Sequence, residues 1–164
     1  MDRDRELLRH FLAAIAYRTQ KALRGAPAHY ATYSAGNRAR TPIELVRHIT
    51  SLMGYVRTFF KGGSYRPEPL PTFKDEVARF HTMLQEVGEL LGSGAPCSLS
   101  TEQLLQGPLA DTMTHVGQLA MLRRLADSPV APENFVYADI RADRLDANQP
   151  PPARPDTNWP EAPK

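Results

Sequence analysis

The sequence predicts an all-α protein, a four-helix bundle followed by a proline-rich irregular C-terminal tail. Three observations lead to this prediction. Four segments of about 20 residues, each about 30 Å long as a helix, carry apolar residues at three- and four-residue steps. Glycine and proline residues separate these segments, and no β-type alternation of useful length occurs before residue 133. Helices that each have one apolar stripe bury those stripes most simply by packing against one another.

The first helix is predicted over residues 3–23, whose apolar positions share one helical face. The second is predicted over residues 42–60, after a polar connection. Its start is a capping box, in which Thr41 and Glu44 satisfy free backbone N–H groups reciprocally, and a proline occupies the first helical position. His48 falls inside the apolar stripe of this second helix.

The second half of the bundle begins after a linker. Prolines at positions 67, 69 and 71 exclude helix there and predict a stiff, extended connection. At roughly 3.3 Å per residue, this linker is long enough to span the bundle. The third helix is predicted over residues 72–91, with a coiled-coil-like seam of apolar residues. A short helical turn at 101–105 precedes the fourth helix, which Gly107 and Pro108 introduce and which ends near Ala126.

The chain after residue 140 is treated as a separate tail, so that the bundle takes residues 1–140 and the tail 141–164. Six of the fifteen prolines lie between Pro150 and Pro163, and such a segment forms neither helix nor interior strand. One interpretation is a disordered or loosely draped tail. The alternative is a segment pinned onto the bundle, or onto a second subunit, by the aromatic and aliphatic side chains of Phe135, Tyr137, Ile140 and Trp159.

Composition narrows the class of protein. The 164 residues are 41% hydrophobic and 23% charged, which is typical of a globular domain, and the formal net charge is +2 with no basic run. Nothing therefore indicates a nucleic-acid partner, and no apolar stretch is long enough to predict a membrane partner. The charged N-terminus does not resemble a secretory signal, and the single cysteine, Cys97, has no internal disulfide partner. A cytoplasmic location is expected.

Polar residues interrupt the predicted core face of the fourth helix. Positions 111, 115, 118, 122 and 125 share one face and read Asp, His, Gln, Leu, Leu, so that the second half of this face is core-like. Asp111 and His115 are neighbours over one turn and are able to chelate one ion, with His48 as a third ligand. Glu44, one turn before His48, is a candidate supporting group or base. The competing interpretation is a surface Asp–His pair and a hydrogen-bonded core histidine.

The heights of these side chains along the bundle axis depend on the directions in which the helices run. If the helices alternate up, down, up and down, the second and fourth helices are parallel, and His48, Asp111 and His115 share a level. If the linker after residue 61 reverses the third helix, this agreement no longer holds.

The segment 107–140 carries a family resemblance. Its runs GPLAD (107–111), THVGQL (114–119), LRRL (122–125) and PENF (132–135) resemble the fourth helix and following turn of DinB/YfiT-like proteins. The run TPIELVRH (41–48) is similar to the second helix of that family. The order and spacing of the four helices fit as well, so the resemblance covers residues 3–140.

This resemblance implies a four-helix bundle, a homodimer, and a divalent metal held by three histidines, one on the second helix and two on the fourth. Transferred to this sequence, the ligands are His48, Asp111 and His115, with Asp111 in the place of a histidine. A set of two histidines and one carboxylate suits zinc, nickel, iron or manganese. The aspartate is also compatible with a lineage whose site has decayed.

Two classes of function are compatible with these residues. The first is a metal-dependent enzyme, a thiol transferase that uses a low-molecular-weight thiol or a hydrolase of another small molecule, in which the metal lowers the pKa of its bound thiol or water. Candidate substrate-orienting residues are Glu44, Gln118, Tyr30 and Tyr33. The second is a non-enzymatic helical binding or stress-related module with a vestigial metal site, in which His48 and Asp111 form a buried polar link.

Overall fold

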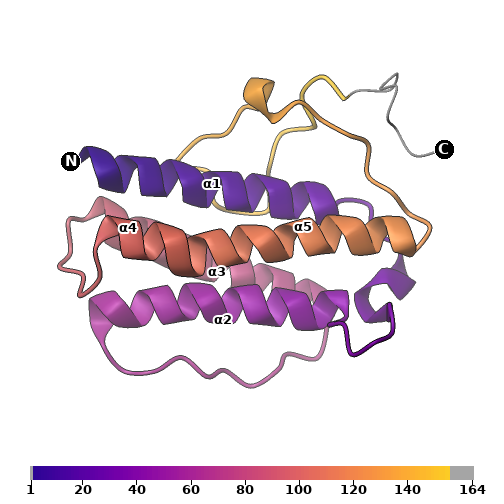
Figure 1. Cartoon of the computed structure of the whole chain (residues 1–164), viewed down its shortest axis with the longest axis horizontal. Helices are drawn as coiled ribbons and strands as arrows, with labels where there is room; N and C mark the ends of the chain where they lie inside the picture. The colour runs from indigo at the N-terminus through magenta and orange to yellow at the C-terminus, as the bar shows by residue number, and fades with distance from the viewer. Residues whose placement is uncertain (1, 156–164) are drawn as a thin grey trace.

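The computed structural model of the chain describes residues 2–155, and within that range it is all-α apart from one isolated bridge between Glu133 and Pro155. The long helices are α1, α2, α3 and α5, and a single turn, α4, precedes α5 (Figure 1). Their bounds are Arg3–Leu23 (α1), Pro42–Lys61 (α2), Phe73–Gly92 (α3), Thr101–Leu104 (α4) and Ala110–Leu125 (α5). The predicted all-α bundle is therefore confirmed for this part of the chain.

Local capping begins each of the first three long helices. Asp2 accepts a hydrogen bond from the Asp4 N–H at the start of α1. At the start of α2, Thr41 and Glu44 form the predicted capping box, with the Thr41 N–H donating to the Glu44 carboxylate over 2.8 Å. Thr72 caps α3 by accepting from the Asp75 N–H. These bonds satisfy backbone groups that have no partner inside the helix.

The direction of α3 decides between the two possible topologies. The linker 62–72 runs the whole length of α2, so that α2 and α3 point the same way (Figure 1). Two ion pairs confirm this register, because Arg47 bonds Glu76 and Arg57 bonds Glu86, each at 2.6 Å and with the same sequence offset. The up-down-up-down arrangement is therefore wrong for this chain, and α2 and α5 are antiparallel.

The linker is held in place by one tyrosine and one buried carboxylate. A Cβ atom added to Gly54 on α2 would lie 2.0 Å from the Tyr65 ring, so the ring rests directly on the helix backbone. The Glu76 side chain is fully buried, accepts from the Leu70 N–H at 2.7 Å, and pairs with Arg47 and Arg79. Burial by itself would raise the pKa of Glu76, but these bonds outweigh it and lower the pKa.

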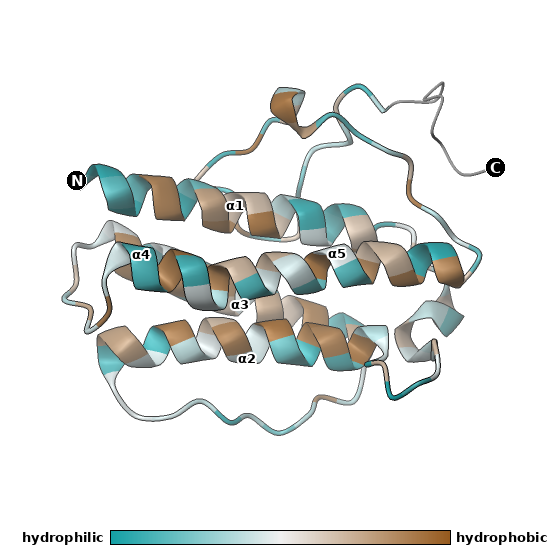
Figure 2. Cartoon of the chain, viewed as in Figure 1, coloured by the Kyte–Doolittle hydropathy of each residue, from teal (hydrophilic) through white to brown (hydrophobic). Residues whose placement is uncertain are grey.

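The core lies between the four long helices. The long helices carry both hydrophobic and hydrophilic residues along their length, whereas the linker below α2 has mostly intermediate to hydrophilic residues (Figure 2). On α5 the buried face differs from the predicted stripe, because Leu119, Leu122 and Val116 are buried whereas Leu125 is 48% exposed. The predicted core role of Leu125 is therefore wrong. The residues that form the centre of the core are Leu12, Ile15, Ala16, Leu45, Ile49, Met53, Phe80, Leu84, Val87, Leu109 and Leu119.

The chain after α5 lies against the bundle as far as it is described. Leu145 is only 7% exposed, and its carbonyl accepts from His81 Nδ1 on α3 at 2.7 Å. The Arg24 side chain donates to the carbonyl of Gln149 at 2.5 Å. The described chain after α5 is therefore held against the bundle; of the side chains expected to pin it, Phe135 and Ile140 pack there, Tyr137 is 52% exposed, and Trp159 lies outside the described residues. Among the described helices, none has the length and apolar character that crossing a membrane requires.

Candidate metal centre

Two helices bring the three predicted metal ligands together. His48 comes from α2, and Asp111 and His115 come from α5. One ligand atom from each side chain lies within 4.8 Å of the others. The His48 and His115 rings are nearly perpendicular, at 83°, with their centroids 4.5 Å apart. The spatial convergence that was predicted for these three residues is present.

The helix that carries Asp111 and His115 is longer than its α5 bounds suggest. A turn of wider pitch, Leu105–Leu109, joins α4 to α5 and kinks at Gly107, where φ is −94° and ψ is −107°. The continuous helical rod, residues 101–125, therefore starts at Thr101 rather than at Pro108. His115 consequently lies near the middle of this rod and not close to its first turn. Because α2 is antiparallel to this rod, His48 in the first half of α2 lies level with Asp111 and His115, which flank the middle of the rod. The three side chains meet for this reason, and the parallel-level argument does not apply.

His115 is held in one ring orientation by a glutamine of its own helix. Its Nδ1 lies 2.8 Å from Gln118 Oε1, and since that oxygen only accepts, Nδ1 carries the proton. The other ring nitrogen, Nε2, therefore faces Asp111 Oδ1, 3.3 Å away. Gln118 performs the orienting role that metal-binding histidines require from a neighbouring group. The His115 residue is 9% exposed.

The remaining two ligands differ in their surroundings. Asp111 keeps 49% of its side chain exposed, so the cluster opens to solvent on that side. His48 is half-buried, and among the described residues its ring contacts His115 without forming a hydrogen bond. Burial, the charge of Arg40 and the neighbouring His115 lower the pKa of His48, against the opposing effect of Asp111. A lowered pKa favours the neutral imidazole, which is the form that binds metals.

The donor geometry fits a divalent ion. Ligand atoms at about 2.0–2.2 Å from a tetrahedral ion lie roughly 3.3–3.6 Å from one another. The Asp111–His115 pair already has that spacing, at 3.3 Å, and the separations involving His48 stay within 4.8 Å. Three protein ligands with a solvent-facing side leave positions open for a further ligand.

The other predicted site residues are placed less favourably. Tyr30 is fully buried, and its hydroxyl donates to the Leu119 carbonyl at 2.7 Å, so the prediction that it orients a substrate is wrong. The Glu44 carboxylate is exposed and engaged with Thr41, which lowers the pKa of Glu44. Tyr33 is half-buried against the core. Of the four candidates, Gln118 is the one for which the structure shows a hydrogen bond to a predicted ligand.

A cleft beside the cluster contains residues that sequence reasoning missed. Its volume is about 490 Å³, and Gln118 and Leu45 line it together with Arg38 and Arg40. Gly36, Asn37 and Arg38 all have positive φ angles, which sharply turns the loop before α2. The Gly-Asn pair is a signal for such a turn, but nothing in the sequence indicates that the arginines after it lie near His48.

The fold and this site together define an all-α helical protein with a histidine–aspartate–histidine cluster between two antiparallel helices. No protein-family model matches the chain, and comparisons with curated proteins and with solved structures find no significant match. The function of the chain is therefore argued from the geometry of the site.

Proposed function

We propose that this chain is a DinB-like metal-binding protein whose divalent ion, zinc, nickel, iron or manganese, is held by His48, Asp111 and His115. The observation that carries the proposal is the convergence of three ligand atoms within 4.8 Å from two separate helices. The hydrogen bond from His115 to Gln118 supports it, because it leaves Nε2 directed at the cluster. The resemblance of residues 41–48 and 107–140 to the DinB/YfiT-like family points the same way.

The activity we propose is metal-dependent transfer of a low-molecular-weight thiol, or hydrolysis of another small molecule. An ion at this site would supply a Lewis acid that lowers the pKa of a bound thiol or water. The exposed side of Asp111 gives such a molecule access, and Arg38, Arg40 and Gln118 line the adjacent cleft. Gln118 therefore contributes to both the cluster and the cleft.

The second candidate is a non-enzymatic helical module with a vestigial site. The pairing of His115 with the half-exposed Asp111 one turn away favours it, since such pairs occur on helices without any metal. This pair replaces the buried His48–Asp111 link expected from the sequence. Under this hypothesis His48→Leu is tolerated, and divalent ions do not change the melting temperature of either protein.

Metal content distinguishes the two candidates. Untagged wild-type protein is expected to purify with close to one divalent ion per chain by elemental analysis, whereas His115→Ala retains the helical circular dichroism spectrum and loses the ion. His10→Ala is the matched control, because His10 is exposed on α1 and has no role in the cluster. Full metal content in His115→Ala would disprove the metal assignment.

Thermal melting provides an independent measurement. An ion that binds only the folded state at 100 times its Kd stabilises the protein by about 2.7 kcal/mol. The melting temperature of the wild type should therefore rise with added zinc or nickel, and the rise should vanish in His48→Leu.

An activity assay tests the enzymatic part of the proposal. The metal-loaded protein should accelerate the reaction of glutathione with an aryl chloride, and His115→Ala should not.

A homodimer is also part of the proposal. Met121 and Leu125 are exposed one turn apart on α5, at 55% and 48%, and two large apolar residues on one helix face suit a contact between copies. Light scattering after size exclusion is expected to give twice the chain mass for the wild type. Met121→Glu should shift it to the monomer mass.

A further inference from the structure

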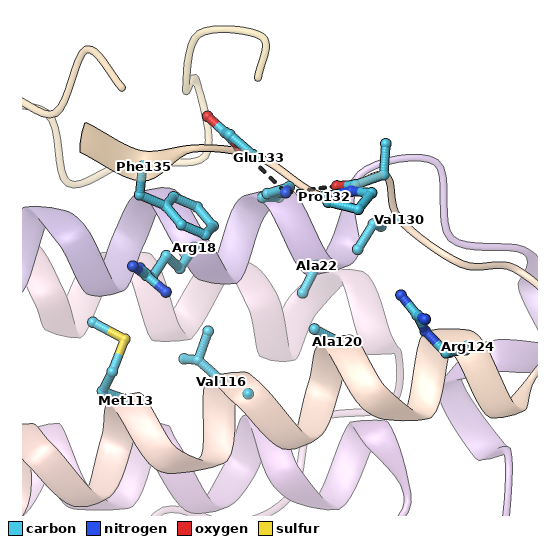
Figure 3. Close-up of a pocket in the computed structure, with 13 residues that line it drawn as sticks. Arg18, Ala22, Met113, Val116, Ala120, Arg124, Val130, Pro132, Glu133 and Phe135 are labelled. Atoms are coloured by element: carbon cyan, nitrogen blue, oxygen red, sulfur yellow. Dashed lines mark hydrogen bonds and ion pairs between the residues drawn. The ribbon is translucent and has the colours of Figure 1, made fainter. Parts of the chain in front are cut away.

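A second cavity lies on the face of α5 that the metal cluster does not use. It has a volume of about 360 Å³ and lies between α1, α5 and the segment 130–135 (Figure 3). This volume is at the lower end of the range for small-molecule sites, about 300–1,000 Å³. Its apolar lining comes from Ala22, Met113, Val116, Ala120, Val130 and Pro132.

Small side chains at facing positions of two helices create this space. Ala22 on α1 and Gly117 and Ala120 on α5 line the cavity, where larger residues would fill the groove between the helices. The segment 130–135 crosses above them and forms a roof (Figure 3). Because Met113, Val116 and Ala120 follow one another at three- and four-residue steps, they share a face that differs from the face of Asp111, His115 and Gln118. The cavity is therefore separate from the metal cluster.

Polar contacts fix the roof in place. Glu133 accepts from the Tyr17 hydroxyl and, at 2.8 Å, from the Ala153 N–H. Lys21 donates to the Ala131 carbonyl at 2.7 Å and lies 3.4 Å from the second oxygen of Glu133. The charges of Lys21 and Glu133 thus compensate each other at the edge of the cavity. The segment 130–135 that covers the cavity is therefore fixed by hydrogen bonds and an ion pair.

Two further cations at the cavity lack an ion pair of this kind. Arg18 extends from α1 at one end of the cavity and Arg124 from α5 at the other (Figure 3). The Arg18 guanidinium lies 3.6 Å from the centroid of the Phe135 ring, which holds it in place. Within residues 2–155, neither Arg18 nor Arg124 forms an ion pair with a carboxylate. An apolar cavity therefore carries, at its edges, two guanidinium groups that no carboxylate of the described chain contacts.

We propose that this cavity binds a small carboxylic acid with an apolar body, whose hydrocarbon part lies on the alanine and valine floor and whose carboxylate pairs with Arg18. Arginine pairs with carboxylates through two parallel N–H···O bonds, and such charge-assisted bonds are stronger where water is partly excluded. Partial burial also lowers the pKa of Arg18, against the opposing effect of the Glu133 charge, which is consistent with a partly dehydrated guanidinium. Arg124 contributes a second, more exposed positive charge. This inference is independent of the proposed metal function.

The test uses the full chain in calorimetric titrations with two probes that share the naphthalene body, 2-naphthoate with a charged carboxylate and 2-naphthylmethanol with a neutral hydroxymethyl group. A charge-assisted hydrogen bond contributes about 1.5–3 kcal/mol, so the acid is expected to bind at least about ten-fold more tightly than the alcohol. Arg18→Gln should remove most of this preference and leave the affinity for the alcohol nearly unchanged. Arg141→Gln is the matched control, since Arg141 is exposed and pairs with Asp143 away from the cavity.

One further variant tests whether the probes bind inside this cavity. Ala120→Leu places a larger side chain on the floor and should abolish binding of both probes, whereas its metal content should equal that of the wild type. If Ala120→Leu fails to fold, Arg18→Gln still decides the question through the acid-to-alcohol ratio. Equal affinities of the wild type for both probes, or an unchanged ratio in Arg18→Gln, would overturn the proposal. So would a dimer that Ala120→Leu dissociates, combined with no acid binding by the wild type, because the cavity would then belong to a second copy.

Discussion

Two histidines show how strongly local surroundings decide the role of one residue type. The Nδ1 of His115 bonds Gln118, and its Nε2 faces Asp111. Because the Asp111 side chain is 49% exposed, the His115 ring is oriented toward a partly open site. His81 on α3 is 4% exposed, and its Nδ1 lies 2.7 Å from the Leu145 carbonyl. Because a carbonyl only accepts, His81 Nδ1 carries the proton, and its buried Nε2 has no hydrogen-bond partner within the described chain. His81 therefore acts as a structural group of the core.

The setting of His81 predicts sensitivity to acid. Burial lowers the pKa of His81 from its ordinary value of 6.5, although the Leu145 carbonyl and the nearby Asp146 oppose this effect. The unfolded chain therefore takes up a proton below about pH 6.5 that the folded chain excludes. The stability linked to neutral His81 is present above about pH 6.5 and is lost as the pH falls toward the lowered pKa of the folded state.

Unfolding by urea at several pH values between about 5 and 7 measures this contribution. The free energy of unfolding of the wild type should decrease on acidification with a slope of at most about 1.4 kcal/mol per pH unit from this group. His81→Phe should be less stable at neutral pH, because the Leu145 carbonyl loses its donor, and should show a smaller slope. Identical slopes for the two proteins would contradict the prediction.

The linker and the kinked rod determine how the helices of the bundle face one another. The linker 62–72 returns the chain to the starting end of α2, which makes α2 and α3 parallel. The turn at Leu105–Leu109 extends α5 backward to Thr101, which sets the position of His115 along the bundle. Both connections are therefore as important for the candidate site as the helices that carry the ligands.

The packing of the linker gives a prediction in which two effects have opposite signs. Gly54→Ala raises helix propensity, which by itself would stabilise α2 by about 0.5–1 kcal/mol. The added Cβ would, however, lie 2.0 Å from the Tyr65 ring, and overpacking of this kind costs about 1–3 kcal/mol. Chemical denaturation should therefore show a net loss of stability.

Gly117→Ala is the control for this substitution. Gly117 is also a helix residue, on α5, and a Cβ atom there would meet nothing within 4 Å. The same change should therefore stabilise the protein at this position by about 0.5–1 kcal/mol. If both variants gain stability, Tyr65 does not rest on Gly54 as described.

The bundle and the segment 133–155 share one core. Leu145 belongs to the buried cluster, and a Cβ atom added to Gly88 on α3 would lie 2.4 Å from its side chain. Arg24, just after α1, connects the same parts from another side, since its side chain donates to the carbonyls of Gln149 and Pro150. The described part of the segment that follows α5 is thus packed and hydrogen-bonded like the helices it covers.

Truncation of Leu145 tests whether this segment unfolds together with the bundle. Leu145→Ala removes a side chain that is 7% exposed and should lower the free energy of unfolding by about 2–5 kcal/mol in a single transition. Val136→Ala is the control, since Val136 is 86% exposed, and its effect should stay within about 0.5 kcal/mol. A separate early transition in Leu145→Ala would show that the segment is not part of the cooperative unit.

Local patterns in the sequence were sufficient to predict the helices and to select the three candidate ligands. Helix α1 has the predicted bounds, and α2 starts at the predicted capping box, because apolar periodicity and capping act over a few residues. His48, Asp111 and His115 were identified from their place on helix faces in the same way. Such patterns depend only on neighbours along the chain.

How these pieces meet could be learned only from the folded chain. The direction of α3, the burial of Tyr30 and His81, the exposure of Leu125 and the placement of Gln118 against His115 all depend on contacts between distant segments. The cavity between α1, α5 and residues 130–135 has the same origin, since small residues leave space only where two particular helices face each other. Helix periodicity specifies which side of a helix is apolar. Which other helix or segment packs against that side depends on the packing of the whole chain.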